Sequence, residues 1–477
     1  MTQIQSLTEK KNFTFSSNFT TNEQVTFSYH FSIYHDLFWV YRRNSFDMAQ
    51  SYVLGLMRCE KNHTNMERMS EFDTHNDYHR YYHFLSESPW DAFQVNRITA
   101  QEASRVLHAQ KLQTGLPTGL IIDESSHLKK GKESVGVSRQ YAGQIGKVDN
   151  CQVAVYASLC NGVHNTLLSN RLFLPEQWTS DKKRMEKAGI PSEYQSHKTK
   201  PELALEIIDE AIKNGVEFDW IGGDGLYGHH SELTRSLDQR GLFYVLDVHK
   251  NEHIYLQEPV LSLPPKKGTK GRLPSQLKAD IAPVSLETYR AGLKASDWTE
   301  VKVRKTTKGF KKVKVHIGKV WHWNGKESQA CPRILVMSVD SKDKRVKYSF
   351  SNGQADEYTP KEYAWYQCSR YWVERSFDDA KNELGLSGYQ VRSWRAWHHH
   401  VALVMAAALY LMKRRINKMD EYPLLSLRDA RILTIAHLFG NEQTIRLVYR
   451  NMINRHRVRK RDIDRHFRKD MDQEKIE

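Results

Sequence analysis

GLIIDESS, residues 119–126, is the stretch that decides the fold, because a short aliphatic run passes directly into a carboxylate and two hydroxyl residues. A similar run, FDWIGGDGLYG at residues 218–228, breaks at paired glycines and brings Asp224 to its carboxyl end. Open α/β sheets carry their functional groups at the carboxyl ends of their strands. We therefore predict that both runs are strands of an α/β sheet and that Asp123 and Asp224 lie at its functional edge.

A third acid lies in a helical segment, RYWVERSFDDAK at residues 370–381. At about 100° per residue, Arg370, Glu374 and Lys381 fall within roughly 40° of one another on a helix. Each acid alone is weak evidence, since an aspartate at a strand end is more often a helix cap or a turn former. Together, three carboxylates in these settings indicate a centre that holds two divalent metal ions for phosphodiester chemistry.

The composition agrees with a nucleic-acid partner. The chain of 477 residues has 71 Lys and Arg against 56 Asp and Glu, which gives a formal net charge of +15. Such a surplus favours polyanions such as DNA, although many soluble proteins are basic without a specific partner. The five cysteines form no close pair typical of a zinc site or a disulfide framework, which fits a reducing, cytoplasmic compartment.

The longest apolar stretch is VALVMAAALYLM, residues 401–412. It is shorter than the roughly 20 residues that span a bilayer, and basic residues follow it at once. We predict a buried core helix in this stretch and expect no membrane partner.

Changes in residue composition and in the spacing of apolar residues divide the chain into six parts. Strand-like runs that first follow one another and then alternate with helical segments predict a mixed sheet flanked by helices. The parts are a flexible tail (1–28), a helical N-terminal DNA-binding domain (29–116), the first part of the core (117–249), a basic β-rich insertion (250–360), the last helices of the core (361–415) and a helical basic C-terminal region (416–477).

Within the insertion, residues 298–323 alternate cationic and apolar side chains around a Lys-Gly turn. The period of two predicts a β-hairpin with Val301 and Val303 on one side and Lys302 and Arg304 on the other. One face can then pack on the protein while the other meets phosphate. An ordinary solvated hairpin is the alternative.

Three of these segments carry a family resemblance. IIDESS, GGDGLYG and RYWVERSFDDAK resemble the motifs of the DDE transposases of bacterial insertion sequences, and in particular the group with a Tyr, Arg, Glu, Lys signature around the last acid. Residues 129–157, 174–191 and 198–208 are similar to long stretches of those proteins. The resemblance covers most of residues 80–412.

The resemblance implies an α/β fold with an RNase H-like catalytic core, a β-rich insertion before the last catalytic acid and a helical N-terminal domain. It implies that Asp123, Asp224 and Glu374 are the catalytic, metal-binding acids and hold two Mg²⁺ ions, for which Mn²⁺ can substitute. The implied activity is metal-dependent cleavage at the terminal inverted repeats of an insertion sequence and strand transfer into target DNA. The implied assembly is a homodimer in a synaptic complex on double-stranded DNA, associated with a bacterial nucleoid.

Two other functions remain open at this point. One is a catalytically inactive DNA-binding protein derived from a transposase. The other is an RNase H-like DNA nuclease without strand transfer.

Arg370 and Lys381 match the signature at its usual spacings, four residues before and seven after Glu374, which implies that both contact DNA. The signature tyrosine does not match. Gln367 stands at its position, three residues before the arginine, and Tyr366 lies one position away. Tyr366 is therefore the candidate for the tyrosine's role at the DNA.

Three further residues are candidate DNA contacts. Lys129 and Lys130 follow the first acid, where a DNA backbone would approach the metals, and a solvated basic loop is the alternative. Trp323 borders the basic hairpin. An aromatic side chain at that place can stack on an unpaired base, whereas packing of the hairpin on the core is the alternative.

Glu124 adjoins Asp123 and is an alternative metal ligand. Adjacent residues of a strand point to opposite faces of the sheet. We therefore expect only one of the two to enter the site, and we prefer Asp123.

Overall fold

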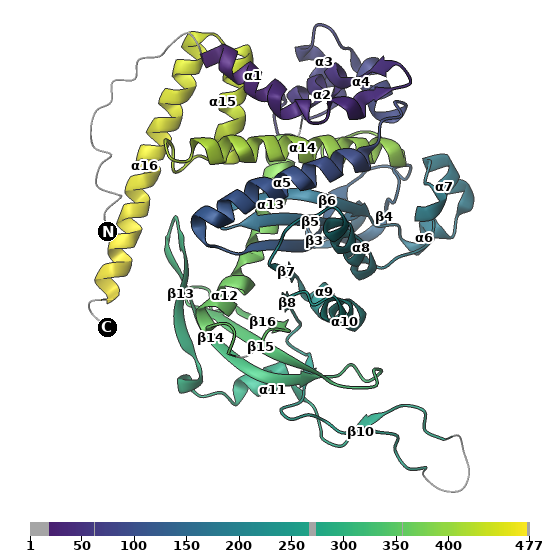
Figure 1. The fold of residues 1–477 in the computed structure, drawn as a ribbon, viewed down its shortest axis with the longest axis vertical. Helices are drawn as coiled ribbons and strands as arrows, with labels where there is room; N and C mark the ends of the chain where they lie inside the picture. The colour runs from purple at the N-terminus through teal and green to yellow at the C-terminus, as the bar shows by residue number, and fades with distance from the viewer. Residues whose placement is uncertain (1–18, 62, 267–272, 355, 475–477) are drawn as a thin grey trace.

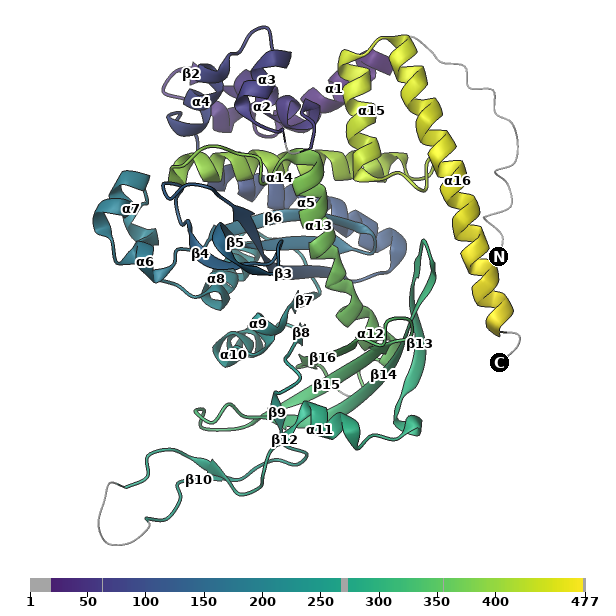
Figure 2. The ribbon, with the colours of Figure 1, turned by 180° about the vertical axis from the view of Figure 1, so that it is seen from behind.

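The computed structural model describes residues 19–61, 63–266, 273–354 and 356–474. A ten-stranded mixed sheet runs through them, and helices flank it (Figures 1 and 2). This arrangement confirms the predicted α/β class with a mixed sheet flanked by helices. Of the predicted flexible tail, residues 1–18 lie outside the described part of the chain.

Six strands form the first part of the sheet: β3 (Thr118–Leu128), β4 (Ser138–Ala142), β5 (Lys147–Asn161), β6 (His164–Leu172), β7 (Trp220–Gly223) and β8 (Tyr244–Asp247). Five of them lie in the order β6–β5–β3–β7–β8, and β4 also pairs with β5. β3, β5 and β6 pair antiparallel. β7 and β8 continue the sheet from β3 in parallel.

The register brings three aspartates to one edge of this sheet. Ile121 of β3 pairs with Gly222 of β7, and Gly223 pairs with Leu246 of β8. Side chains at matching positions of paired strands are neighbours. The same register places three acids side by side: Asp123 within β3, Asp224 just after β7 and Asp247 at the end of β8.

Alternation along β3 decides which helices its side chains meet. Leu120 and Ile122 pack with α5 (Ala92–Thr114) and α8 (Lys200–Lys213). Ile121 points to the opposite face and packs with α12 (Pro360–Ser369) and α13 (Tyr371–Leu384). Alternate residues of a strand lie on the same face, so Asp123 lies on the face of Ile121 and Glu124 on the face of Ile122. The Cβ atoms of the two acids therefore point to opposite faces of the sheet.

The remaining strands of the sheet are β13 (Thr299–Thr306), β14 (Gly309–His322), β15 (Cys331–Asp340) and β16 (Val346–Ser351). They pair antiparallel in sequence order, and β16 pairs with β8. The β-hairpin predicted in residues 298–323 is therefore present as β13 and β14, and the insertion extends the core sheet. Arg304 does not face outward as predicted, because its guanidinium stacks over the rings of Tyr371 and Trp372 on α13.

Short elements complete the middle of the chain: α6 (Glu176–Thr179), α7 (Lys182–Ala188), α9 (Gly225–Gly228), α10 (Ser231–Gln239), β9 (His253–Ile254), β10 (Leu261–Ser262), β11 (Lys278–Ala279), β12 (Val284–Ser285) and α11 (Leu286–Ala291). β10 and β11 form an arm that projects from the body (Figure 1).

Four N-terminal helices lie beside the long helix α14 (Trp394–Lys418), and the second and fourth of them pack on it. They are α1 (Phe19–Ser32), α2 (Phe46–Arg58), α3 (Met66–Phe72) and α4 (Tyr78–Ser86), and the small pair β1 (Trp39–Val40) and β2 (Arg43–Asn44) lies between α1 and α2 in sequence. α1 begins within the predicted tail. The reason is tertiary, because the buried rings of Phe27 and Phe31 pack against Tyr410 of α14.

Residues 401–412 are buried throughout, which confirms the predicted core helix. Within the described ranges, every helix falls short of the length or the apolar character needed to cross a membrane.

Two helices end the chain, α15 (Leu427–Phe439) and α16 (Glu442–Glu474). α16 runs down to the tip of the β13–β14 hairpin (Figures 1 and 2). There the ring of Phe467 meets that of Phe310 edge to face, and the backbone N–H of Phe310 donates to Asp470 at 2.9 Å. The basic insertion and the basic C-terminal region are therefore in contact.

Candidate active site

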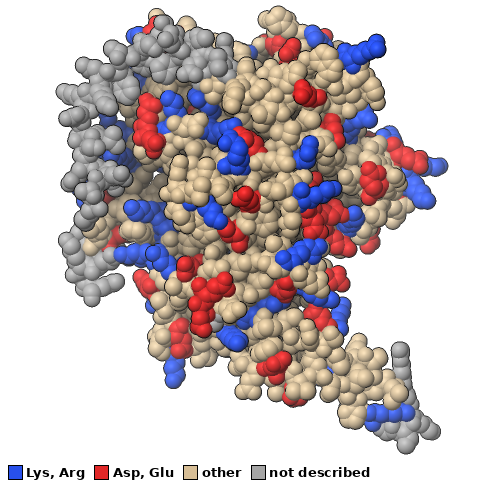
Figure 3. Space-filling model, in the orientation of Figure 1, with Lys and Arg blue, Asp and Glu red and all other residues tan. Residues whose placement is uncertain are grey.

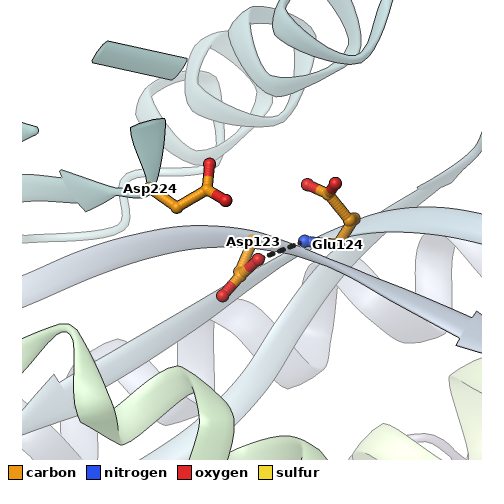
Figure 4. A group of neighbouring side chains, drawn as sticks. All are labelled: Asp123, Glu124 and Asp224. Carbon is orange, nitrogen blue, oxygen red and sulfur yellow. Dashed lines mark hydrogen bonds between the residues drawn. The ribbon is translucent and has the colours of Figure 1, made fainter. Parts of the chain in front are cut away.

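Three carboxylates converge at the carboxyl edge of the sheet. One oxygen from each of Asp123, Glu124 and Asp224 lies within 4.8 Å of the other two (Figure 4). Glu124 was expected to point away from the site. Although it starts from the opposite face of β3, its longer side chain reaches the same space as the two aspartates. Hard oxygen ligands at such separations suit Mg²⁺ or Mn²⁺.

Asp224 combines two roles that the sequence left as alternatives. It is the N-cap of the short helix α9, and its Oδ1 accepts a hydrogen bond from Leu226 N at 2.9 Å. The same carboxylate belongs to the acidic cluster. The turn is tight enough to require glycine, since a Cβ on Gly228 would lie 2.1 Å from the carbonyl oxygen of Asp247.

Glu124 is held by two neighbours. Lys200 Nζ at the start of α8 donates to its Oε1 at 2.9 Å, and the buried Tyr227 hydroxyl donates to its Oε2 at 3.0 Å. Both oxygens are thus already hydrogen-bonded, and an ion bound to Glu124 would compete with these donors.

Arg370 connects the acidic cluster to α13. Its Nη1 lies 3.1 Å from Asp123 Oδ2, and its Nη2 lies 2.8 Å from Glu374 Oε1. Its Nε lies 3.2 Å from Asp247 Oδ2. Glu374 is about half exposed, with 51% of its side chain accessible. The structure therefore places Glu374 next to the cluster, joined to Asp123 through the arginine.

Burial and mutual repulsion raise the pKa values of the two aspartates of the cluster. Burial and then the charge of Asp224 raise the pKa of Asp123 to about 8, against the opposing effect of Arg370. Burial and then Glu124 raise the pKa of Asp224. A divalent cation would relieve this repulsion and favour the ionised forms. The donor set and its electrostatics both fit a metal centre.

The predicted cationic contacts differ in their surroundings. Lys381 lies on the face of α13 near Asp123, where burial lowers its pKa and the charges of Asp378 and Asp123 oppose that effect. Lys129 is largely buried: Nζ donates to the Tyr389 carbonyl at 3.0 Å and stands 3.4 Å from the centroid of that ring. Burial lowers the pKa of Lys129 to about 7. Lys130 is exposed and is the better placed of the two lysines for phosphate.

Tyr366 is buried in an aromatic cluster and is only 7% exposed. Its ring packs against Trp220, Phe243, Tyr358 and Trp365. The ring of Tyr366 therefore packs in the core, and little of its surface is accessible to DNA.

Trp323 is half-buried just beyond β14, and its indole N–H donates to the carbonyl of Glu327 at 2.9 Å. This bond fixes the edge of the ring. Stacking of Trp323 on a base stays a prediction.

The sequence reasoning did not single out Asp247. The signal was present, because LFYVLDV at residues 242–248 is a third apolar run that ends in an aspartate, as GLIIDESS and FDWIGGD do.

The acidic cluster beside this sheet has the donor set of a site for divalent metal ions. Residues 31–310 match the family model for DDE superfamily endonucleases, and the chain belongs to that family. The matched stretch contains Asp123 and Asp224 and ends before Glu374. The chain is also similar to a protein of Microchaete diplosiphon described as "Probable transposase for insertion sequence element IS701". The two are 26% identical over 313 residues, which cover 65% of this chain and 68% of that protein.

Proposed function

We propose that the protein is a Mg²⁺-dependent transposase that binds the terminal inverted repeats of an insertion sequence, cleaves at its ends and joins the strands to target DNA. The observation that carries the proposal is the cluster of Asp123, Glu124 and Asp224, linked to Glu374 by Arg370. The family membership and the similarity to an insertion-sequence transposase support it.

We further propose that the core is RNase H-like. Three antiparallel strands followed by two parallel ones, in the order β6–β5–β3–β7–β8, support this assignment. The first acid lies within β3, the second follows the adjacent strand β7, and the third lies on α13. The insertion enters between the second and third acids and extends the sheet at β8.

Asp123, Asp224 and Glu374 are the proposed metal ligands, and Glu124 is a further candidate. When bound, two ions supply an activated oxygen nucleophile and stabilise the leaving oxygen. The chain's own residues hold the charges in place. Arg370 neutralises part of the acidic charge, and Lys381 places a second cation near Asp123.

Two basic surfaces are proposed to bind the DNA backbone. On the face seen in Figure 3, cationic and acidic side chains are interspersed. The hairpin carries the exposed Lys305 and Lys314. α16 carries a dense set of exposed cations: Arg455, Arg457, Arg459, Lys460, Arg461, Arg465, Arg468 and Lys469. The helical domain at residues 29–116 is a further candidate for end recognition. A homodimer that pairs two transposon ends is the expected assembly, on the DNA of a bacterial cytoplasm.

One experiment tests the proposed function. The protein is incubated with labelled DNA from the element's two ends, a target plasmid and Mg²⁺, beside Asp224→Asn and the surface control Asp209→Asn. Asp209 pairs with Arg240 outside the acidic cluster. Joined product from the wild type and the control, and its loss in Asp224→Asn, supports transposition. Binding without cleavage, or cleavage without joining, contradicts the proposal.

A further inference from the structure

We propose that Asp247 is a positioning residue that holds the guanidinium of Arg370 between two acids of the site. Two buried polar side chains, Gln367 and Ser349, fix Asp247 for this task. The inference deepens the proposed function and rests on it for the effect on DNA cleavage. Its geometry comes from contacts of the described side chains.

Arg370 is surrounded by carboxylates on three sides. Its Nη1 and Nη2 donate hydrogen bonds to Asp123 at 3.1 Å and Glu374 at 2.8 Å. Its Nε lies 3.2 Å from Asp247 Oδ2, an ion pair without the alignment of a hydrogen bond. An arginine side chain has a long flexible stem, so the position of its planar head depends on the partners of each nitrogen. Asp123 and Glu374 are proposed metal ligands and change their charge balance when an ion binds. Asp247 is the third partner and stays outside the acidic cluster.

Both oxygens of Asp247 are engaged away from that cluster. Oδ2 pairs with Arg370, and Oδ1 accepts a hydrogen bond from Ser349 Oγ at 2.7 Å. Ser349 lies on β16 directly opposite Asp247 in the β16–β8 pairing. Ser349 on β16 therefore fixes the carboxylate of Asp247 from the side opposite Arg370.

Gln367 extends this anchoring into the core. Its Nε2 donates to Ser349 Oγ at 2.7 Å and to the Val336 carbonyl at 3.2 Å, and its Oε1 accepts from Ser338 Oγ. Gln367 is 2% exposed and Ser349 is fully buried. The residue that occupies the place of the signature tyrosine thus belongs to a hydrogen-bonded chain that runs from α12 through Ser349 to Asp247.

The consequence concerns metal binding. Without the charge of Asp247, the guanidinium keeps only Asp123 and Glu374 as partners and is drawn further onto them. It then competes more strongly with a cation for their oxygens. Loss of Asp247 should weaken metal binding and slow cleavage, and it should do so only when Arg370 is present.

The test is a double-mutant cycle on the full chain with Mn²⁺ as the probe. Asp247→Asn removes the charge and keeps an oxygen that can accept from Ser349. It is combined with Arg370→Gln, and the Mn²⁺ dissociation constant is measured by titration calorimetry without DNA. The matched control is Asp238→Asn, because Asp238 also pairs with an arginine, Arg333 at 2.6 Å, and accepts from an anchoring amide.

Asp247→Asn should raise the Mn²⁺ dissociation constant on the order of tenfold with Arg370 intact and less than about twofold in Arg370→Gln. Asp238→Asn should leave it unchanged. At saturating DNA and subsaturating Mg²⁺, the cleavage rate of Asp247→Asn should fall about tenfold, with KM for DNA unchanged. Ser349→Ala, which alters no charge but removes one hydrogen bond to the Asp247 carboxylate, should weaken Mn²⁺ binding about threefold.

Equal effects of Asp247→Asn in both backgrounds would show a through-space charge effect and overturn the inference. So would an unchanged dissociation constant in Ser349→Ala, a variant that remains informative if Asp247→Asn does not fold. Because metal binding is measured without DNA, a wild type that fails to join DNA ends overturns the proposed function and leaves this test intact.

Discussion

Asp123 Oδ2 and Arg370 Nη1 lie 3.1 Å apart, although 247 residues separate them in the chain. The pair joins the strand that carries the first acid to the helix that carries the third. It also places a cation against an acid whose pKa is raised by burial and by its acidic neighbour. We therefore expect the charge state of this edge of the sheet to affect both stability and metal binding.

Asp224→Asn should stabilise the metal-free protein while removing its response to metal. The asparagine can still cap α9, but one of three mutually repelling carboxylates is gone. We expect the free energy of unfolding in EDTA to rise on the order of 1 kcal/mol. The rise in Tm that Mg²⁺ causes in the wild type should be lost. Urea denaturation and thermal scans measure both effects, and a less stable variant that keeps its Mg²⁺ response would contradict the expectation.

The stability of the metal-free protein should fall between pH 5.5 and 8.5. The folded-state pKa of Asp123, about 8, lies above the roughly 3.9 of an unfolded aspartate. Between these values the folded state holds a proton that the unfolded state lacks, so stability is lost as pH rises through the folded pKa. Asp123→Asn should flatten this dependence. Urea denaturation in EDTA across the range gives the two slopes, and equal slopes would refute the assignment.

Glu124→Gln should weaken Mn²⁺ binding less than Asp123→Asn does. Both oxygens of Glu124 already accept hydrogen bonds from Lys200 and Tyr227. These donors compete with a metal ion, so Glu124 should contribute less to the metal affinity than Asp123 does. We expect a loss of about three- to tenfold for Glu124→Gln and at least about a hundredfold for Asp123→Asn. Titration calorimetry ranks the two. The reverse order would make Glu124 the main ligand from β3.

Tyr366→Phe should leave DNA binding and cleavage unchanged. The ring packs inside an aromatic cluster, and the phenylalanine retains that packing. Rates of cleavage at saturating DNA are the measurement, with Arg370→Lys as the variant that should lose activity. A tenfold lower cleavage rate in Tyr366→Phe would contradict this expectation and would indicate that Tyr366 acts as the signature tyrosine.

Replacing Lys305 and Lys314 with alanine should lower the salt dependence of DNA binding. Each exposed lysine that contacts a phosphate contributes about 0.9 to the slope of log K against log salt. The double variant should therefore lose nearly two units of slope, measured by fluorescence anisotropy from 50 to 200 mM salt. Lys213→Ala is the control, since that exposed residue ends α8, which packs on β5 and β6.

The sequence predicted those parts of the site that depend on local pattern. Asp123 and Asp224 were found because each ends an apolar run, and Arg370, Glu374 and Lys381 because helical periodicity places them on one face. Parallel pairing of β3, β7 and β8 then brings the strand ends together.

Contacts between remote segments escaped the sequence reasoning. The burial of Tyr366 depends on Trp220 and Phe243, which no spacing near residue 366 reveals. The early start of α1 depends on Tyr410. Glu124 was expected outside the site because strand alternation fixes the direction of Cβ but not the reach of a glutamate side chain.

The pairing of β8 with β16 also has a consequence for biosynthesis. Ser349 and its partner Asp247 lie 102 residues apart, and Arg370 and Glu374 follow later still. A ribosome must release most of the chain before these segments can meet, since domains fold as their parts emerge. A nascent or truncated chain that ends before these segments lacks Arg370 and Glu374 beside the acids of β3 and β7, and we expect it to be unable to cleave DNA.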